Sequence, residues 1–216
     1  MSLIKNQKVI NVVWTMTSKE RERELLPVRV PLFMGLGGCR VFLIKKGNQP
    51  EFNNIHSEQA LKRLYAGQGA DWPDTEILEF NEYNVVKAAV HDTLFSMLEK
   101  GRFDYFPRAM HEAFVEVNHF EGLAVEETIL LKYTAPFFFF VSNENKRLAE
   151  RLEYGLVKMY QDGSFAQFFE SNPYSSGVLS RAGDFKRKVF NLKNPLLSKE
   201  TSEALENPHY EMNCGL

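Results

Sequence analysis

The chain has 216 residues, of which 26 are basic and 28 are acidic. This nearly balanced charge, without a run rich in lysine or arginine, argues against nucleic acid or an anionic membrane as a partner. No apolar stretch reaches the ~18 residues that a membrane-spanning helix needs. The start of the chain also lacks the charged and apolar regions of a secretory signal, so the sequence taken literally predicts a cytoplasmic protein.

Two cysteines, Cys39 and Cys214, show neither the CxxC spacing nor the partner pattern of a zinc site. They would form one disulfide bond in an oxidising compartment, but we favour two free thiols. Gly35, Gly37 and Gly38 are not followed by the Lys-Ser/Thr pair of a phosphate-binding loop. A flexible crossover explains these glycines better, and we predict no cofactor.

Residues 9–14, VINVVW, are almost wholly apolar and β-branched, which predicts a strand buried on both faces. Small hydroxyl residues and one arginine follow its carboxyl end: Thr15, Thr17, Ser18 and Arg21. Such a turn can offer hydroxyls, backbone N–H groups and a guanidinium to a carboxylate. The alternative is that Ser18 only caps a short charged helix over 19–24 and Arg21 is a surface charge.

The next segments predict a strand over residues 37–46 and a helix over 57–65 that begins at a capping serine. Gly67, Gln68 and Gly69 then predict a turn that opens a helix near residues 71–73. Free N–H groups at such a turn can bind an anion, but a tight turn without a ligand is an equal alternative. Trp72 can stack on a ligand or belong to the core.

Residues 85–89 predict a strand, and residues 94–100 a helix that ends at Gly101 in a left-handed cap. The aromatic residues 103–106 then predict a short strand that Pro107 stops. Because ligands of open α/β sheets lie beyond the carboxyl ends of such strands, Arg108 is a candidate contact. The alternative is a solvated loop residue.

Four residues of the following helix could collect a metal ion: His111, Glu112, Glu116 and His119. They lack the HExxH spacing of a helical zinc site, so a solvated helix face is the better interpretation and we predict no metal. Residues 127–141 predict two strands around Pro136, and the run FFFFV at 137–141 predicts a central strand packed on both sides.

The last part of the pattern begins with Asn143, which is expected to cap a helix over residues 146–161 with an apolar stripe. A turn follows at Asp162, Gly163 and Ser164. Beyond Asn172 the chain becomes loop-like.

Three of these motifs carry a resemblance to a known family. They are the hydroxyl residues with Ser-Lys-Glu-Arg at 18–21, Gly-Arg-Phe-Asp at 101–104, and the long helix that ends in Asp-Gly-Ser at 162–164. Over about residues 9–172 the chain resembles the family 3 bacterial extracellular solute-binding proteins. The resemblance implies an α/β fold of two lobes (the type II periplasmic binding protein fold) with two hinge strands and a ligand in the cleft. Lobe 1 would comprise residues 1–34 and 135–216, and lobe 2 residues 35–134.

Ligand contacts that follow from the candidates and the resemblance are Thr15, Thr17, Ser18, Arg21, Gln68, Gly69, Trp72 and Arg108. In the family, a strand corresponding to 103–106 ends in an aspartate that binds the amino group of the ligand. Here Pro107, Arg108 and Ala109 occupy that place. A small polar or anionic solute is therefore expected rather than a simple α-amino acid.

The resemblance implies a periplasmic receptor that serves an ABC permease or a sensor and is not an enzyme. One alternative is a dehydratase-like enzyme, for which Asp71, Glu112 and Glu116 are the only candidate carboxylates; another is a degenerate remnant that binds nothing. The strands that open the first lobe in the family do not precede residue 9. Either the sequence lacks them or a partner chain completes the sheet, so a homodimer is a further expectation.

Overall fold

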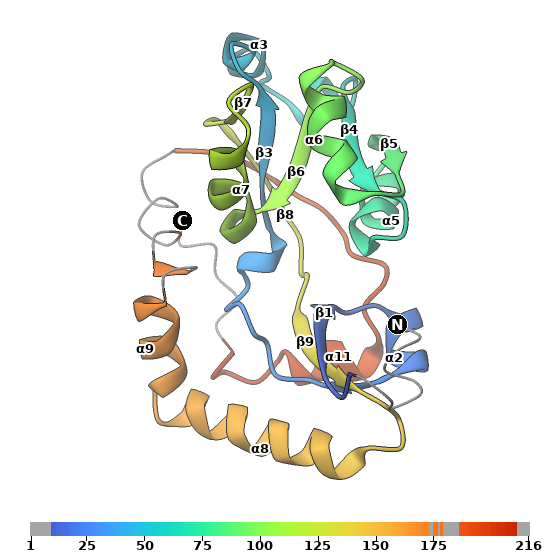
Figure 1. Cartoon of the computed structure of the whole chain (residues 1–216), viewed down its shortest axis with the longest axis vertical. Coiled ribbons are helices and arrows are strands. Elements are labelled where there is room, and N and C mark those ends of the chain that lie inside the picture. Colours follow the sequence, from blue (N-terminus) through green and yellow to red (C-terminus); the bar gives the residue numbers. More distant parts are fainter. Residues whose placement is uncertain (1–9, 173–174, 177, 179–185, 211–216) are drawn as a thin grey trace. The chain divides into compact units, whose positions relative to one another are not determined.

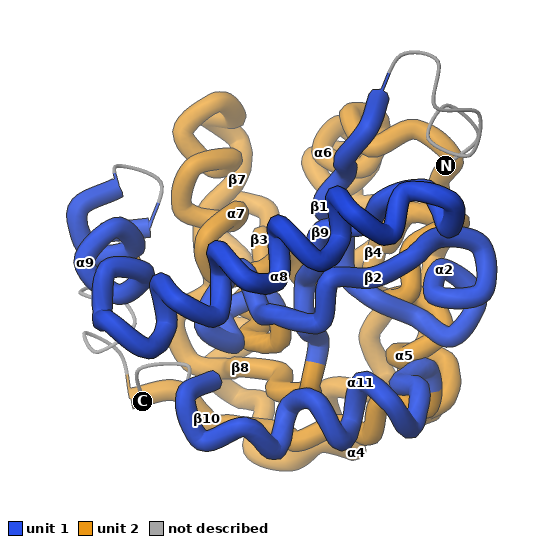
Figure 2. Tube along the Cα trace, turned by 90° about the horizontal axis from the view of Figure 1, so that it is seen from below, with its two compact units in different colours: residues 1–37, 135–176, 196–213 blue, residues 38–134, 177–195, 214–216 orange. Residues whose placement is uncertain are grey.

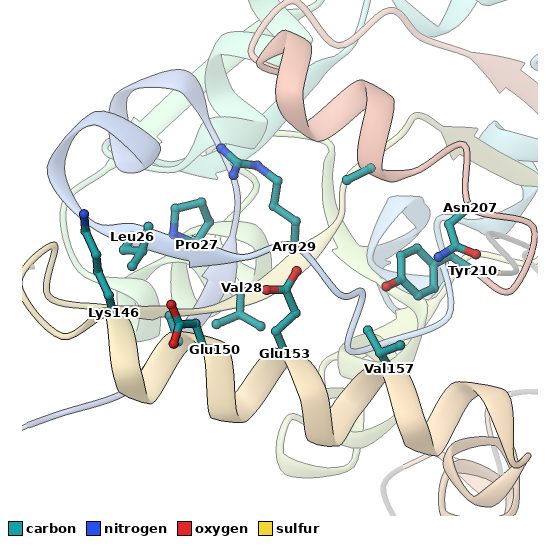
Figure 3. Close-up of a pocket in the computed structure, with 12 residues that line it drawn as sticks. Leu26, Pro27, Val28, Arg29, Lys146, Glu150, Glu153, Val157, Asn207 and Tyr210 are labelled. Atoms are coloured by element: carbon teal, nitrogen blue, oxygen red, sulfur yellow. The ribbon is translucent and has the colours of Figure 1, made fainter.

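The computed structural model describes residues 10–172, 175, 176, 178 and 186–210. The chain divides into two compact units, which Figure 2 draws in different colours. Unit 1 contains residues 1–37, 135–176 and 196–213, and unit 2 contains residues 38–134, 177–195 and 214–216. The sequence placed all of 135–216 in one lobe, whereas the strand β10 (Lys188–Asn191) pairs within unit 2.

Unit 1 is built on a three-stranded antiparallel sheet with the order β1-β9-β2. Its strands are β1 (Val13–Met16), β2 (Leu26–Val28) and β9 (Phe137–Val141). β9 pairs on both sides, which confirms FFFFV as a central strand. β1 lies at the edge of this sheet and Trp14 is 51% exposed, so the prediction of a strand buried on both faces is wrong. Apolar, β-branched residues indicate a strand but not its place in the sheet.

The helices of unit 1 are α2 (Lys19–Glu24), α8 (Lys146–Gln161), α9 (Ser164–Ser171) and α11 (Lys199–Ala204). The stripe Leu148, Leu152 and Leu156 of α8 packs on a core that contains Val28 and Val141. This confirms the predicted amphipathic helix. The predicted cap is wrong: α8 is preceded by Asn145, and the Asn143 amide instead donates to the Glu24 carbonyl at 3.1 Å.

Unit 2 holds a seven-stranded mixed sheet whose main path is β10-β8-β3-β6-β4-β5, with β7 paired to β3; Figure 1 shows β3, β6, β4 and β5 side by side. The strands, besides β10, are β3 (Cys39–Lys45), β4 (Tyr65–Gly69), β5 (Asn84–Ala88), β6 (Tyr105–Ala109), β7 (Leu123–Val125) and β8 (Ile129–Lys132). β4 runs parallel to β5 and to β6, whereas β3 runs antiparallel to β6 and β8. The carboxyl ends of β4, β5, β6 and β8 therefore lie at the sheet edge where β3 begins.

A helix follows each of the parallel strands β4, β5 and β6. The helices of unit 2 are α3 (Gln49–Asn53), α4 (Glu58–Leu61), α5 (Pro73–Phe80), α6 (His91–Glu99) and α7 (Met110–Glu116), which continues into a 3-10 turn over Val117–His119. α4 is shorter than predicted, because Tyr65 already belongs to β4. None of the described helices is long and apolar enough to cross a membrane.

A predicted turn and a predicted strand end both lie inside strands. Gly67, Gln68 and Gly69 belong to β4 rather than to a turn, and Pro107 lies within β6 rather than at its end. β6 pairs with β4 at Ala66 and Tyr105, and the Gln68 side-chain amide donates to the Pro107 carbonyl at 3.2 Å. The Gln68 side chain thus supplies a hydrogen bond to β6 at Pro107, whose own nitrogen has no hydrogen to donate.

The C-terminal part is not loop-like throughout, because it forms β10 and α11. Cys39 is disulfide-bonded, so the prediction of two free thiols is wrong. Cys214 lies outside the described residues. A thiol whose partner is distant in the sequence gives no local signal of its pairing.

Gly67 is expected to tolerate no side chain. A Cβ added there would lie 2.2 Å from Cζ of Phe103, so Gly67→Ala should lower the free energy of unfolding by about 1–3 kcal/mol, measured by urea denaturation. The matched control is Gly155→Ala in α8, where an added Cβ meets nothing within 4 Å. Phe103→Leu should recover part of the loss, and an unchanged stability of Gly67→Ala would contradict the close packing.

Candidate functional site

The edge of the unit 2 sheet at which the parallel strands end gathers charged and aromatic side chains. We name the following set the carboxyl-edge cluster: Arg40, Trp72, Asp74, His91, Arg108, Glu112, Glu116 and Tyr133. They come from the start of β3, the turn and helix after β4, the start of α6, the end of β6, α7, and the residue after β8. Ligands of open α/β sheets bind at this type of edge.

Arg108 lies at the centre of the cluster and is only 6% exposed. Its Nε and Nη2 donate to the two carboxylate oxygens of Glu116 at 2.7 and 2.6 Å, and its Nη2 lies 3.1 Å from Glu112. Burial opposes the charge of Arg108, but these carboxylates outweigh it and raise the pKa of the guanidinium. Arg108 is therefore neither a solvated loop residue nor an uncompensated cation, and an anion would have to compete with Glu116.

A second set of the cluster contains Arg40, Asp74 and Tyr133. Nη2 of Arg40 lies 2.8 Å from Oδ1 of Asp74, and the Tyr133 hydroxyl donates to the same oxygen. Nη1 of Arg40 is 3.9 Å from Glu112, which joins this set to Arg108. Burial raises the pKa of Tyr133 well above its ordinary value, so the phenol remains a donor. Across the cluster two guanidiniums face three carboxylates, which leaves an excess of negative charge.

Trp72 gives the cluster an aromatic surface. Its ring stacks on Phe106 at 6.2 Å and lies 5.7 Å from the ring of His91, and the Arg108 guanidinium lies 5.1 Å from its centre. Trp72 is half-buried. Arginine and a flat ring in this arrangement attract each other through the ring quadrupole. The side chain is therefore held in one orientation with part of its surface accessible.

Gln68 and Gly69 have structural roles in β4: the Gln68 amide bonds the Pro107 carbonyl, and Gly69 lies against the ring of Trp72. Gln68 is fully buried, and a Cβ on Gly69 would lie 2.4 Å from Cε2 of Trp72. Only glycine therefore leaves room for the ring. The N–H groups after the strand are used internally, since Ala70 donates to the Ala88 carbonyl and Trp72 to the Gly69 carbonyl. The predicted anion-binding turn is not formed by these two amides.

In unit 1, the other predicted contacts lie together from the end of β1 to the first turn of α2. We name residues 15–21 the binding turn. Nη1 of Arg21 donates to Oγ1 of Thr15 at 2.8 Å and to the Met16 carbonyl at 2.7 Å. Ser18 caps α2 by accepting from the Arg21 amide at 3.2 Å, which agrees with the prediction that Ser18 is a helix cap. Thr17 is fully buried, and its hydroxyl donates to Glu22.

The four residues weighed as a metal site are not arranged as one. Among the described residues no group of histidine, cysteine, aspartate and glutamate side chains could hold a metal ion. Glu112 and Glu116 instead pair with Arg108.

The sequence matches no protein-family model and no curated protein. Solved structures do match. An ancestral arginine-binding protein bound to arginine is 22% identical, with 78% of this chain and 74% of that chain covered and a TM-score of 0.57. The chain has the fold of such substrate-binding proteins. This confirms the two-lobe α/β fold that the sequence resemblance implied.

Of two further similar structures, one is a transporter protein and the other is the precursor of an enzyme. One is an amino acid ABC transporter substrate-binding protein from Streptococcus pneumoniae bound to L-arginine, at 14% identity, 81% and 71% coverage of the two chains and a TM-score of 0.61. The other is an ancestral amino acid-binding protein, a precursor of cyclohexadienyl dehydratase, at 15% identity, 78% and 71% coverage and a TM-score of 0.57.

Within this substrate-binding-protein fold, the eight predicted residues form two sets, one in each unit. Sequence reasoning missed Arg40, Asp74, His91 and Tyr133. Glu112 follows Arg108 by four positions, a spacing that pairs side chains on a helix and could have indicated the ion pair. No local signal links Arg40 to Asp74, because only the order of the strands brings them together.

Proposed function

We propose that the protein is a solute-binding protein that holds a small polar solute at the carboxyl-edge cluster of unit 2. The single observation that supports this most is the gathering of two arginines, three carboxylates and a half-buried tryptophan at the sheet edge where ligands of α/β sheets bind. The shared fold adds to it, since the similar structures include proteins bound to arginine and to glutamine. The predicted contacts Thr15, Thr17, Ser18 and Arg21 remain part of the proposal within unit 1.

The charges of the cluster favour a different class of solute from the anionic one that the sequence suggested. Arg108 is already paired with two carboxylates, so it no longer supports an anion. The excess carboxylate instead favours a group that donates hydrogen bonds, such as an ammonium or a guanidinium. Arg21 stays a candidate contact for an anionic group within unit 1. An α-amino acid is compatible with this arrangement, because Glu112 and Glu116 supply the negative charge that the missing aspartate would supply.

A transport role outside the cytoplasm is proposed together with binding. The protein from Streptococcus pneumoniae belongs to an ABC transporter, so we propose an ABC permease as the membrane partner. The disulfide bond of Cys39 agrees with an oxidising compartment. We propose binding without turnover; because one similar structure is a dehydratase precursor, mass spectrometry of the solute after incubation should return it unchanged.

The decisive experiment is titration with L-arginine and L-glutamine by calorimetry, after native mass spectrometry of the gently purified protein has shown whether a solute is already bound. Trp72→Ala should weaken binding about three- to tenfold, because the solute loses an aromatic contact. Phe80→Ala is the matched control, since Phe80 is 56% exposed at the far end of α5. Equal affinities of the Trp72→Ala and Phe80→Ala variants would refute this location of the site.

A further inference from the structure

A buried carboxylate, Glu22, joins the binding turn to the C-terminal part of unit 1. Its side chain is 5% exposed. Four side chains donate to its two oxygens, at distances of 2.5–2.8 Å: Thr17, Thr201, Ser198 and Arg29. All four donors lie outside α2, and Ser198 and Thr201 are distant from it in the sequence, so Glu22 is a junction of several segments.

The charge of Glu22 is stable in this surrounding. Burial disfavours the carboxylate, but the hydrogen bonds from Thr17, Thr201, Ser198 and Arg29 outweigh burial and hold the pKa of Glu22 below its ordinary value. Hydrogen bonds to an ionised acceptor are stronger than those between neutral groups. Glu22 is thus an ionised acceptor whose two oxygens receive four hydrogen bonds. Loss of one donor weakens the contact between the segments that Glu22 joins.

The backbone makes a second connection at the same place. The Lys19 amide, at the start of α2, donates to the Leu196 carbonyl at 2.9 Å. The segment 196–201 therefore contacts α2 at its first residue and again at Glu22, and Arg21 lies between these two contacts. α2 has only six residues and is too short to be stable without such support.

The residues that precede segment 196–201 are hydrogen-bonded within unit 2. Residues 188–191 pair with β8, and the Lys193 amide and carbonyl both bond to the side chain of Asn81, at 3.0 and 2.8 Å. The chain then passes from Lys193 to Leu196 in three residues. Segment 196–201 therefore follows closely in the chain on residues that are hydrogen-bonded within unit 2.

We infer that Glu22 is a positioning residue, through which Thr201 of α11 holds the binding turn in the geometry that places Arg21. Only the effect on solute affinity rests on the proposed function; the effect on the structure of the binding turn does not. Glu22 contacts no solute itself; it fixes Thr17 and the helix that carries Arg21. Loss of the Thr201 hydroxyl should loosen the turn without unfolding either unit.

The test variant is Thr201→Val, which keeps the branched shape of the buried side chain and removes the hydroxyl. Hydrogen exchange of a peptide that covers residues 13–25 should become about tenfold faster, while a peptide over β9 stays unchanged. Thr201→Ser should restore the protection. The matched control is Ser202→Ala, which removes an exposed hydroxyl on the same helix that donates to the Ser198 carbonyl.

Unchanged exchange over residues 13–25 in Thr201→Val would overturn the inference. The binding readout is separate: the affinity for L-arginine should fall in Thr201→Val and not in Ser202→Ala. Should the unaltered protein bind neither L-arginine nor L-glutamine, the proposed function fails for these solutes, and the exchange experiment still decides the role of Glu22. Faster exchange with an unchanged affinity for a bound solute would overturn the link to Arg21.

Discussion

Replacing Arg40 by methionine should lower the free energy of unfolding by about 3–5 kcal/mol. Arg40 is 2% exposed, and its Nη2 lies 2.8 Å from Asp74, which also accepts from Tyr133. Removal of the guanidinium leaves the Asp74 carboxylate buried without its cation, and this uncompensated charge is what costs the energy. Urea unfolding at pH 7, followed by circular dichroism, measures the change.

A double variant shows whether the cost comes from losing the Arg40–Asp74 ion pair or from leaving Asp74 without a cation. When Asp74→Leu is added to Arg40→Met, no carboxylate remains at this position, and the stability should recover most of the loss because a buried ion pair is often replaced by apolar residues at little cost. Tyr133→Phe is added to this double variant, because the Tyr133 hydroxyl loses its acceptor when Asp74 is replaced. A cost of Arg40→Met below about 1 kcal/mol, the size of an exposed ion pair, would show that water solvates the pair.

Elements with a long or strongly periodic pattern were predictable from the sequence. The apolar stripe of α8 and the continuous apolar run of β9 leave few alternatives, and both elements have the predicted type and place. Local rules failed where tertiary pairing decides. Pro107 and the glycines of β4 read as breaks, but neighbouring side chains make them part of strands: the Gln68 amide bonds Pro107, and the rings of Phe103 and Trp72 fill the space that Gly67 and Gly69 leave.

Prediction of the candidate site was limited in a different way. Trp72 and Arg108 were identified from their places beside the predicted ends of elements; Trp72 directly precedes α5, and Arg108 lies in the last residues of β6. The charge that Arg108 presents was not predictable without its partners, and these decide which solute the cluster favours. Arg40 and Asp74 are 34 positions apart on different elements, and their ion pair follows from the antiparallel register of β3 and β6 together with the turn after β4.

Acidification should destabilise the protein between about pH 6.5 and pH 4 through His111 of α7. Burial lowers the pKa of His111 to about 4; Glu112 opposes this shift, whereas Arg40 and Arg108 add to it. The unfolded chain binds a proton at a pKa of about 6.5. Between these values the unfolded state holds more protons than the folded state, so the free energy of unfolding falls as the pH falls, by up to about 3 kcal/mol at pH 4.

The variant His111→Gln isolates this contribution, because glutamine keeps polar atoms in a side chain of similar length and does not titrate. Urea unfolding at pH 7 and at pH 4.5 should show a smaller loss of stability in His111→Gln than in the unaltered protein. His119→Gln, at an exposed histidine in the 3-10 turn that follows α7, is the matched control for the loss of a histidine. The same pH dependence in all three proteins would mean that the pKa of His111 does not differ between the folded and unfolded states, and that Glu112 offsets burial and the two arginines.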